Sequence, residues 1–212
     1  MSNFREYTLQ KLRAEFGLSL VPSLASLDEW LSTQVMITAA EREVLNSLSQ
    51  KLMNRIYAYN EQELILKCIG TIIGIVDLDG NNYRAFAERQ LTATIDGKEL
   101  SGKPDLMIAT GTEEPETPYF CFHEYKKTID IDRHPAGQCL AAMLAAQHLN
   151  NATQVIYGSF VIGREWCFMT LEGNQYAISN AYLVTRDDIF DIARILRALR
   201  LKIDAIVNAP IS

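Results

Sequence analysis

The sequence lacks any long apolar run. Near the middle of the chain, the longest largely apolar stretch extends only from Ile69 to Val76, which is far too short to span a bilayer. The opening residues contain no basic start followed by an apolar run, so we expect no secretion signal. The sequence therefore predicts a cytoplasmic protein without a membrane partner.

Cysteine is scarce as well. The four cysteines form neither a CxxC pair nor a His–Cys cluster and are widely spaced, at Cys68, Cys121, Cys139 and Cys167. This spacing favours buried thiols in a reducing compartment over a disulfide framework or a zinc site.

The signatures of three large enzyme classes are absent. The sequence contains no GxSxG, no GxxxxGK[ST] and no GxGxxG after a predicted strand. Serine-hydrolase, P-loop and Rossmann interpretations therefore fail on their own motifs.

The chain also has no excess of positive charge. Its formal net charge is −6, whereas non-specific binding of a duplex draws on Lys and Arg side chains that neutralise phosphates. A chain of this composition must gather its basic residues on one face, bind nucleic acid weakly, or not bind it. A bound metal ion would add positive charge at the site itself.

The first part of the chain has the pattern of helices. With 212 residues, 48% hydrophobic and 22% charged, the protein can form one compact domain with or without a helical annex. Residues 4–58 show helical spacing of apolar side chains. Ser26 with Glu29 predicts a capping box, and Thr38 and Asn60 predict two further helix starts.

From residue 82 the pattern changes to that of strands. We expect strands over 83–95, 98–110 and 119–126, with a hairpin turn at Asp96-Gly97. The remaining expected elements are a helix over 135–149, strands over 155–160, 166–171 and 176–179, and a helix over 186–207. This order predicts an α/β fold with a mixed sheet flanked by helices. Residues 59–212 would form the α/β domain and residues 1–58 an N-terminal helical annex.

Three polar residues are candidates for chemistry. In a strand, positions i and i+2 point to the same face, so Glu124 and Lys126 project together, with Phe120 deeper on that face. If the neighbouring strand carries Asp105, the two carboxylates meet as hard oxygen ligands suited to Mg²⁺ or Mn²⁺. Lys126 could then orient or deprotonate an attacking water, or stabilise charge that develops on a phosphate.

Pro104-Asp105 followed by Glu124-x-Lys126 resembles the signature of the PD-(D/E)XK nuclease superfamily. The predicted element order is similar to the αβββαβ, restriction-endonuclease-like core of that superfamily. The resemblance covers roughly residues 60–172 and leaves the N-terminal helices and the last helix unexplained. It implies a metal-dependent phosphodiesterase with Asp105, Glu124 and Lys126 as catalytic residues and Mg²⁺ or Mn²⁺ as cofactor.

Three further features extend the resemblance. Glu63 lies on the helix before the first strand, where many members place a further metal-binding acid. Gln138 opens the helix after the motif strand, where RecB-like members place a glutamine. The backbone carbonyl of Tyr125 would add a ligand to the metal held by Asp105 and Glu124.

Each of these residues also has a simpler interpretation. Glu124 and Lys126 could form a surface charge pair that contributes little. Asp105 could cap a turn after a proline. Glu63 could interact only with its helix dipole, and Gln138 could cap its own helix.

Other polar residues are weaker candidates. We expect His123 on the face opposite Glu124, as a packed or surface imidazole, whereas His134 and Arg133 lie in a loop where they could contact a phosphate. Lys127 is expected to face solvent or the nucleic acid backbone. On the last helix a basic stripe is interpreted as a solvated face and not as a DNA track; it consists of Arg194, Arg197, Arg200 and Lys202.

Three functional hypotheses follow from this sequence. The first is a metal-dependent nuclease, with nucleic acid as partner, DNA favoured, and a homodimer left open. The second is a binding or regulatory module that keeps the fold without cleaving, motivated by the acidic charge. In the third, residues 1–60 mediate assembly and the α/β part is a scaffold.

Overall fold

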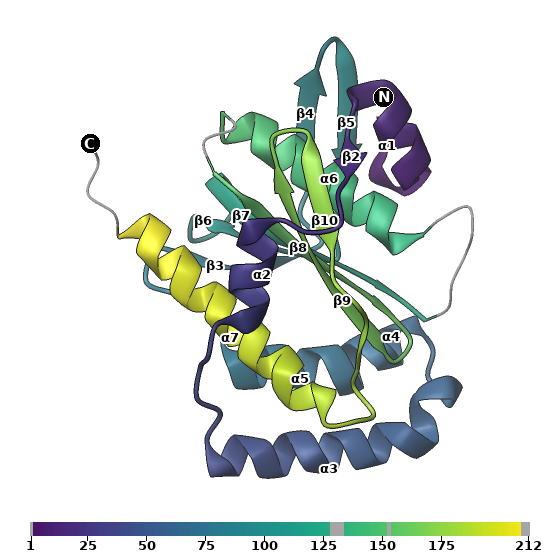
Figure 1. Cartoon of the computed structure of the whole chain (residues 1–212), viewed down its shortest axis with the longest axis vertical. Coiled ribbons are helices and arrows are strands. Elements are labelled where there is room, and N and C mark those ends of the chain that lie inside the picture. The colour runs from purple at the N-terminus through teal and green to yellow at the C-terminus, as the bar shows by residue number, and fades with distance from the viewer. Residues whose placement is uncertain (1, 128–133, 152–153, 209–212) are drawn as a thin grey trace.

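The computed structural model describes residues 2–127, 134–151 and 154–208, whose elements are shown in Figure 1. The helices are η1 (Phe4–Glu6), α1 (Leu9–Phe16), α2 (Ala25–Ser32), α3 (Ala39–Arg55), η2 (Ile56–Ala58), α4 (Glu61–Leu64), the π-helical η3 (Ile65–Ile69), α5 (Gly70–Val76), α6 (Pro135–Leu149) and α7 (Asp188–Val207). The strands are β1 (Ser2–Asn3), β2 (Ser19–Leu20), β3 (Tyr83–Ala87), β4 (Leu91–Ile95), β5 (Lys98–Gly102), β6 (Leu106–Thr110), β7 (Glu116–Lys126), β8 (Ile156–Ile162), β9 (Glu165–Glu172), β10 (Gln175–Ile178) and β11 (Tyr182–Leu183).

The main sheet is mixed, as the sequence predicted. Its strand order is β2–β10–β9–β8–β7–β6–β3, with β11 beside β9. Strands β7 and β8 run parallel and are connected through α6, whereas β3, β6 and β7 form an antiparallel series. A second sheet of order β1–β5–β4 lies apart from the main one.

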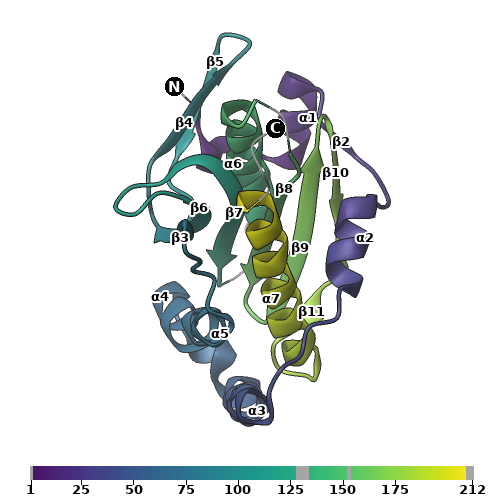
Figure 2. The same ribbon diagram turned by 90° about the vertical axis from the view of Figure 1, so that its left-hand side faces the viewer.

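Two hydrophobic clusters lie on the two faces of the main sheet. The first joins the sheet to α2, α3, α5 and α7 through residues such as Trp30, Ile72 and Leu196. The second joins it to α6, α1 and the β4–β5 hairpin through residues such as Met143 and Phe122. Figures 1 and 2 show α7 crossing one face while α6 lies behind the strands. In the described part of the chain, no helix combines the length and apolar character needed to cross a bilayer.

Residues before position 59 contribute to both clusters. Phe4 and Leu12 belong to the α6 cluster, and Leu45 belongs to the α7 cluster. Trp30 donates a hydrogen bond from Nε1 to the carbonyl oxygen of Ile195 at 2.8 Å. Residues before position 59 therefore pack on the α/β core, and two pieces of the segment expected to be helical are the strands β1 and β2.

The predicted helix starts have different outcomes. Thr38 and Glu41 form a complete capping box at the start of α3, as predicted. The predicted box at Ser26 is wrong, because α2 already begins at Ala25 and its N-cap is Leu24. The Ser26 hydroxyl instead donates to Thr170 Oγ1 at 3.1 Å. The side chain that was expected to cap the helix therefore makes a tertiary contact with β9.

The predicted strand over 83–95 is two strands. Between them, Glu88 has a positive φ of 51°, and the chain leaves the main sheet there. Strand β3 pairs with β6, and β4 pairs with β5 in the second sheet. The Asp96-Gly97 turn is confirmed, with positive φ at both residues (50° and 76°), as a tight type I′ hairpin requires.

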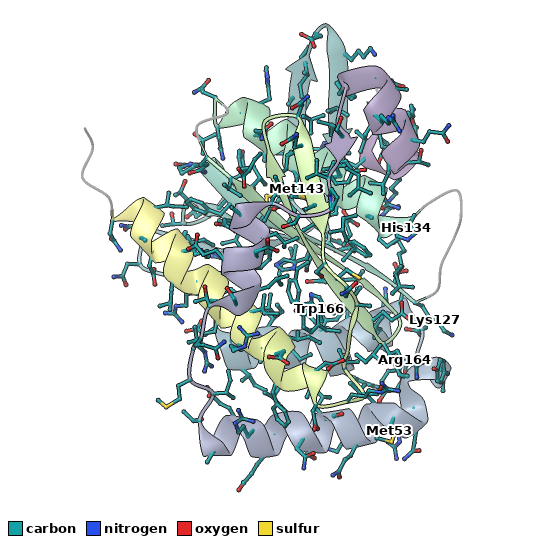
Figure 3. The ribbon with its side chains drawn as sticks, viewed as in Figure 1. Met53, Lys127, His134, Met143, Arg164 and Trp166 are labelled. Atoms are coloured by element: carbon teal, nitrogen blue, oxygen red, sulfur yellow. The ribbon has the colours of Figure 1, made fainter. Side chains whose placement is uncertain are left out.

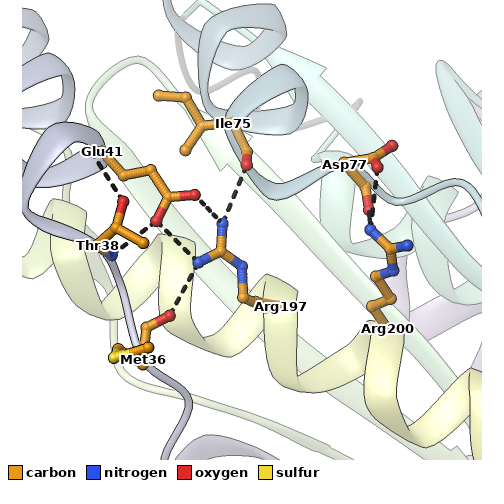
Figure 4. A network of polar contacts seen from close by, with 7 residues as sticks. All are labelled: Met36, Thr38, Glu41, Ile75, Asp77, Arg197 and Arg200. Carbon is orange, nitrogen blue, oxygen red and sulfur yellow. Dashed lines mark hydrogen bonds and ion pairs between the residues drawn. The ribbon is translucent and has the colours of Figure 1, made fainter.

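The interpretation of the basic stripe on α7 as a solvated face is wrong. Arg197 donates to both carboxylate oxygens of Glu41 (2.7 and 3.0 Å) and to the carbonyl oxygens of Met36 and Ile75 (Figure 4). The other cations of the stripe also hold neighbouring segments: Arg194 binds the carbonyls of Leu31 and Thr33, Arg200 binds Asp77, and Lys202 binds Glu29. These side chains fasten α2, α3 and α5 to α7.

Candidate active site

Strand pairing brings Asp105 and Glu124 together. In the antiparallel pair β6–β7, Leu106 lies opposite His123, so Asp105 and Glu124 are the next neighbours along. The backbone N–H of Tyr125 donates to Asp105 Oδ2 at 2.7 Å. The Glu124 and Asp105 carboxyls are close enough for each to affect the pKa of the other. The expected meeting of the two acids is present in the structure.

Burial makes this acid pair electrostatically unusual. Glu124 is only 3% exposed, and Asp105 is partly buried. Burial, and then the charge of Asp105, raises the pKa of Glu124 well above its usual range. Burial also raises the pKa of Asp105, against the opposing effects of the Tyr125 N–H and the Lys126 charge. The pair therefore holds a proton more tightly than two exposed acids would.

The oxygen atoms of this pair fit a divalent cation. Over the described ranges, no three or more His, Cys, Asp or Glu side chains gather as a complete metal site. Mg²⁺ is commonly held by one or two carboxylates, with water and substrate phosphate completing its shell. An ion held by Asp105 and Glu124 would replace the proton they share and relieve the repulsion between two carboxylates.

Lys126 lies at the end of β7 and contacts Glu61, an acid that was not among the candidates from the sequence. Its Nζ is 3.3 Å from Glu61 Oε1, and its side chain is 20% exposed. Lys126 lowers the pKa of both Asp105 and Glu124, whereas the charge of Glu61 raises that of Asp105. Lys126 and Glu61 are therefore within electrostatic reach of the acid pair.

Glu63, the helix acid named from the sequence, is engaged elsewhere. Its Oε2 accepts from the backbone N–H of Asn60 at 3.1 Å, and its Oε1 accepts from Lys67 at 2.7 Å. Asn60 and Glu63 form a capping box. A capping residue commonly pairs with an acid three positions later, so the sequence itself predicts that Glu63 caps the helix with Asn60. Glu61 is then the acid of this helix that is free to contact the site.

The first turn of α6 faces the acid pair and contains Gln138, which is 2% exposed. Its neighbour Cys139 donates to the carbonyl oxygen of Phe122 at 3.5 Å. Burial, and then the charge of Glu124, raises the pKa of the Cys139 thiol. Gln138 is therefore buried near the start of α6, the helix in which the sequence placed it, and its role at the site stays a prediction.

The two described histidines near the site have structural roles. His123 is fully buried and bonds Ser159 through Nδ1, and burial lowers its pKa to about 3. His134 is the N-cap of α6, where its Nδ1 accepts from the N–H of Ala136 at 3.2 Å. His134 also packs edge-on against Phe160. Arg133 lies outside the described residues.

A bulge in β7 changes the face on which Phe120 lies. Ile108 pairs with Cys121, but the next residue of β6, Ala109, pairs with Tyr119. Phe120 is therefore the extra residue of the bulge. Phe122 stays on the α6 side with Glu124, but Phe120 packs in the cluster of α7. The expectation that Phe120 lies below Glu124 on the same face is therefore wrong, because the extra residue interrupts strict alternation.

Two cations, Lys127 and Arg164, lie near the end of β7. Figure 3 shows Lys127, His134 and Arg164 on the same side of the molecule. Lys127, Arg164 and Tyr57 line a cavity of about 240 Å³, in which the Arg164 guanidinium lies 6.0 Å from the Tyr57 ring centroid. Lys127 is exposed, in agreement with the prediction that it faces solvent.

The N-terminal segment also reaches the site, which the sequence did not indicate. The positive charge of Arg5, in η1, lowers the pKa of Glu124 against the larger raising effect of burial. Asp105, Glu124 and Lys126 thus come together with Glu61 and Arg5 around them.

No family model matches the sequence, and neither does any curated protein.

Proposed function

We propose that the chain is a metal-dependent nuclease of the PD-(D/E)XK type that cleaves nucleic acid, with DNA as the favoured substrate. Asp105 and Glu124 would hold Mg²⁺ or Mn²⁺, together with the Tyr125 carbonyl. Lys126 would orient the attacking water or stabilise charge on the phosphate. When bound, the ion would polarise the scissile phosphate and lower the pKa of a water molecule.

The observation that carries this proposal is the carboxyl pair formed by buried Glu124, near the end of β7, and partly buried Asp105, just before β6. Burying two acids in contact costs free energy, and perturbed acids of this kind cluster at functional sites. Lys126, two residues after Glu124, adds the cation that a phosphate needs. The order α4–α5, β3, β6, β7, α6, β8 supports an αβββαβ core, with the β4–β5 hairpin inserted between β3 and β6.

The chain's own residues prepare the site for this chemistry. The Tyr125 N–H fixes one oxygen of Asp105, which limits the orientations of that carboxyl. Phe122, on the same face of β7 as Glu124, belongs to the hydrophobic cluster that joins the sheet to α6, and Glu124 is itself only 3% exposed. Lys126 is partly exposed and paired with Glu61, which holds its ammonium group in place.

A non-catalytic binding module is the second candidate. Many cations are already committed to acids, as in the pairs Lys67–Glu63, Arg197–Glu41 and Lys202–Glu29. The formal net charge of −6 gives the chain no overall excess of positive charge for a long nucleic acid footprint. This favours a short contact, with or without cleavage.

The test is a cleavage assay on single- and double-stranded DNA and RNA with Mg²⁺, Mn²⁺ or chelator. Wild-type protein should cut only with metal, and Asp105→Asn and Lys126→Ala should each lower the rate by about 100-fold or more. Glu113→Gln and Lys51→Ala, at exposed positions, serve as matched controls and should keep the wild-type rate. Cleavage of none of the four substrates, with no Mn²⁺-induced rise in melting temperature, would favour the binding module.

A further inference from the structure

A polar cavity lies between the N-terminal segment and the β4–β5 sheet. Its volume is about 420 Å³, within the range of about 300–1,000 Å³ typical of small-ligand sites. The side chains and backbone that line it belong to Asn3, Arg5, Gln90, Ser101, Gly102 and Lys103. Two of these residues are cations and none is an acid.

The N-terminal segment is fixed at this cavity by specific packing. Strand β1 pairs in parallel with β5, with Asn3 opposite Ser101. Phe4 packs directly on Gly102, where an added Cβ would lie 2.5 Å from the ring. The Asn3 side chain accepts from the backbone N–H of Arg5 at 3.0 Å. These contacts place Arg5 at the cavity from a segment distant in sequence.

The two cations of the cavity are outside the ion pairs found in the described part of the chain. Among the described residues, Arg5 and Lys103 form no ion pair, whereas Lys98 on the same hairpin pairs with Glu15. Unpaired cations that share a cavity attract an anion. Both residues are exposed, so a ligand can reach them from solvent.

The cavity and the acid pair belong to one surface. Lys103 precedes Asp105 by two residues, and Arg5 exerts its charge on Glu124. Phe4, beside Arg5, belongs to the same cluster as Phe122, which shares the face of Glu124. Lys103 thus connects the cavity to the chain segment that carries Asp105.

Hydrogen-bonding groups complete the cavity wall. Gln90 donates from Nε2 to Ser101 Oγ at 2.8 Å, and Ser101 and Thr92 share a hydrogen bond of 2.7 Å. This network orients the Gln90 amide at the rim. Amide and hydroxyl groups of this kind contact the phosphates and sugars of nucleic acids.

We propose that the Arg5–Lys103 cavity is a phosphate-binding subsite that holds the nucleotide next to the scissile phosphodiester. This inference rests on the proposed nuclease function. It gives the N-terminal segment a role in substrate binding, with Arg5 as a substrate-binding residue outside the αβββαβ region. The ligand group is a phosphodiester of a nucleic acid strand; a free nucleotide or inorganic phosphate would use the same chemistry.

The test is binding of a fluorescein-labelled single-stranded oligonucleotide, measured by anisotropy with Ca²⁺ in place of Mg²⁺. Arg5→Gln and Lys103→Gln should each weaken binding by about 5–10-fold, and each should reduce the slope of log K against log salt by about 0.7. Arg5→Lys should retain most of the affinity. Lys51→Gln and Arg186→Gln, far from the cavity in sequence, are matched charge controls and should bind like the wild type.

Competition and rate measurements separate the remaining outcomes. An unlabelled oligonucleotide should displace the probe at far lower concentration than a mononucleotide or inorganic phosphate; equal displacement by the small anions would overturn the strand assignment. If wild type binds and cleaves while both Gln variants bind equally well, the subsite is wrong and the nuclease proposal stands. If wild type neither binds nor cleaves, the nuclease proposal fails and the subsite with it.

Discussion

Glu124 is an acid that the fold buries in contact with another acid. Burial and the neighbouring Asp105 raise the pKa of its carboxyl. The β6–β7 ladder does not require an ionisable group there, because a glutamine has nearly the same shape and can also hydrogen-bond Asp105. The acid therefore lowers the free energy of unfolding unless a cation binds to it.

Replacing this acid by its amide should stabilise the metal-free protein. In chelator, Glu124→Gln is expected to raise the melting temperature by roughly 2–4 °C, which is about 1 kcal/mol for a chain of this size. Mn²⁺ should raise the melting temperature of the wild type and leave that of the variant unchanged. Differential scanning calorimetry measures both effects, with Glu113→Gln as the control. A variant that melts lower than wild type in chelator would identify Glu124 as a stabilising structural group.

The sequence predicted the centre of the site better than its surroundings. Strand alternation and a nearby hairpin sufficed to bring Asp105 to Glu124, because both lie in neighbouring strands. Glu61 was missed because two acids begin the same helix and only the cap distinguishes them. Arg5 was missed because its position depends on the two-residue pairing of β1 with β5, which leaves no periodic pattern.

At the scale of elements, α7 organises one face of the molecule. Arg197 of this helix holds Glu41 at the start of α3 and two backbone carbonyls from other segments. Its side chain is only 17% exposed, so this interaction is less screened than a surface ion pair. The Arg197 guanidinium, followed by the N–H of Thr38, lowers the pKa of Glu41 from 4.5 to about 2.

The Glu41 contact should depend on pH in a defined direction. Because the pKa of Glu41 is lower in the folded state, its stabilising effect is present above about pH 4.5 and is lost as the pH falls towards about 2. Glu41→Gln should therefore lower the free energy of unfolding at pH 7, with a smaller deficit at pH 3. Urea unfolding at pH 7, 5 and 3 measures this, with Glu43→Gln, exposed on the same helix, as control. If Glu41→Gln lowers the free energy of unfolding equally at all three pH values, the loss comes from packing and not from the charge of Glu41.

Element type was easier to predict than element pairing. The helices over 135–149 and near 186–207 were found because their apolar residues recur at helical spacing. The split of residues 83–95 was missed because β3 and β4 are both strands and differ only in their partners. Pairing depends on contacts between distant residues, which a local pattern does not contain.

At the scale of the whole molecule, the start of the chain packs against α6. Gly137, in the first turn of α6, lies so close to the N-terminal backbone that an added Cβ would be 2.3 Å from the carbonyl oxygen of Tyr7. Backbone atoms cannot move aside as the end of a flexible side chain can. This glycine therefore sets the distance between α6 and the segment that contains Arg5.

Gly137→Ala should destabilise the protein by about 2 kcal/mol, because overpacking a close contact typically costs 1–3 kcal/mol. Gly74→Ala is the matched control: in α5 an added Cβ at Gly74 meets nothing within 4 Å, and alanine there should stabilise by about 0.5–1 kcal/mol. Chemical unfolding of both variants tests the pair. An equal change in the free energy of unfolding at the two glycines would show that helix propensity, and not the contact with Tyr7, determines the effect of the substitution.

The pairing of β1 with β5 and of β2 with β10 has a consequence for synthesis of the chain. Residues 19–20 find their sheet partners only at residues 175–176, and Trp30 finds its hydrogen-bond acceptor only at Ile195. Residues 19–20 and Trp30 are therefore synthesised long before their native partners. Closing such long loops costs entropy before any contact forms, which slows folding. Arg5 finds its place earlier, because β1 pairs with β5 at residues 100–101, so on the proposed function the substrate-binding segment would be placed before β2 and α2 are.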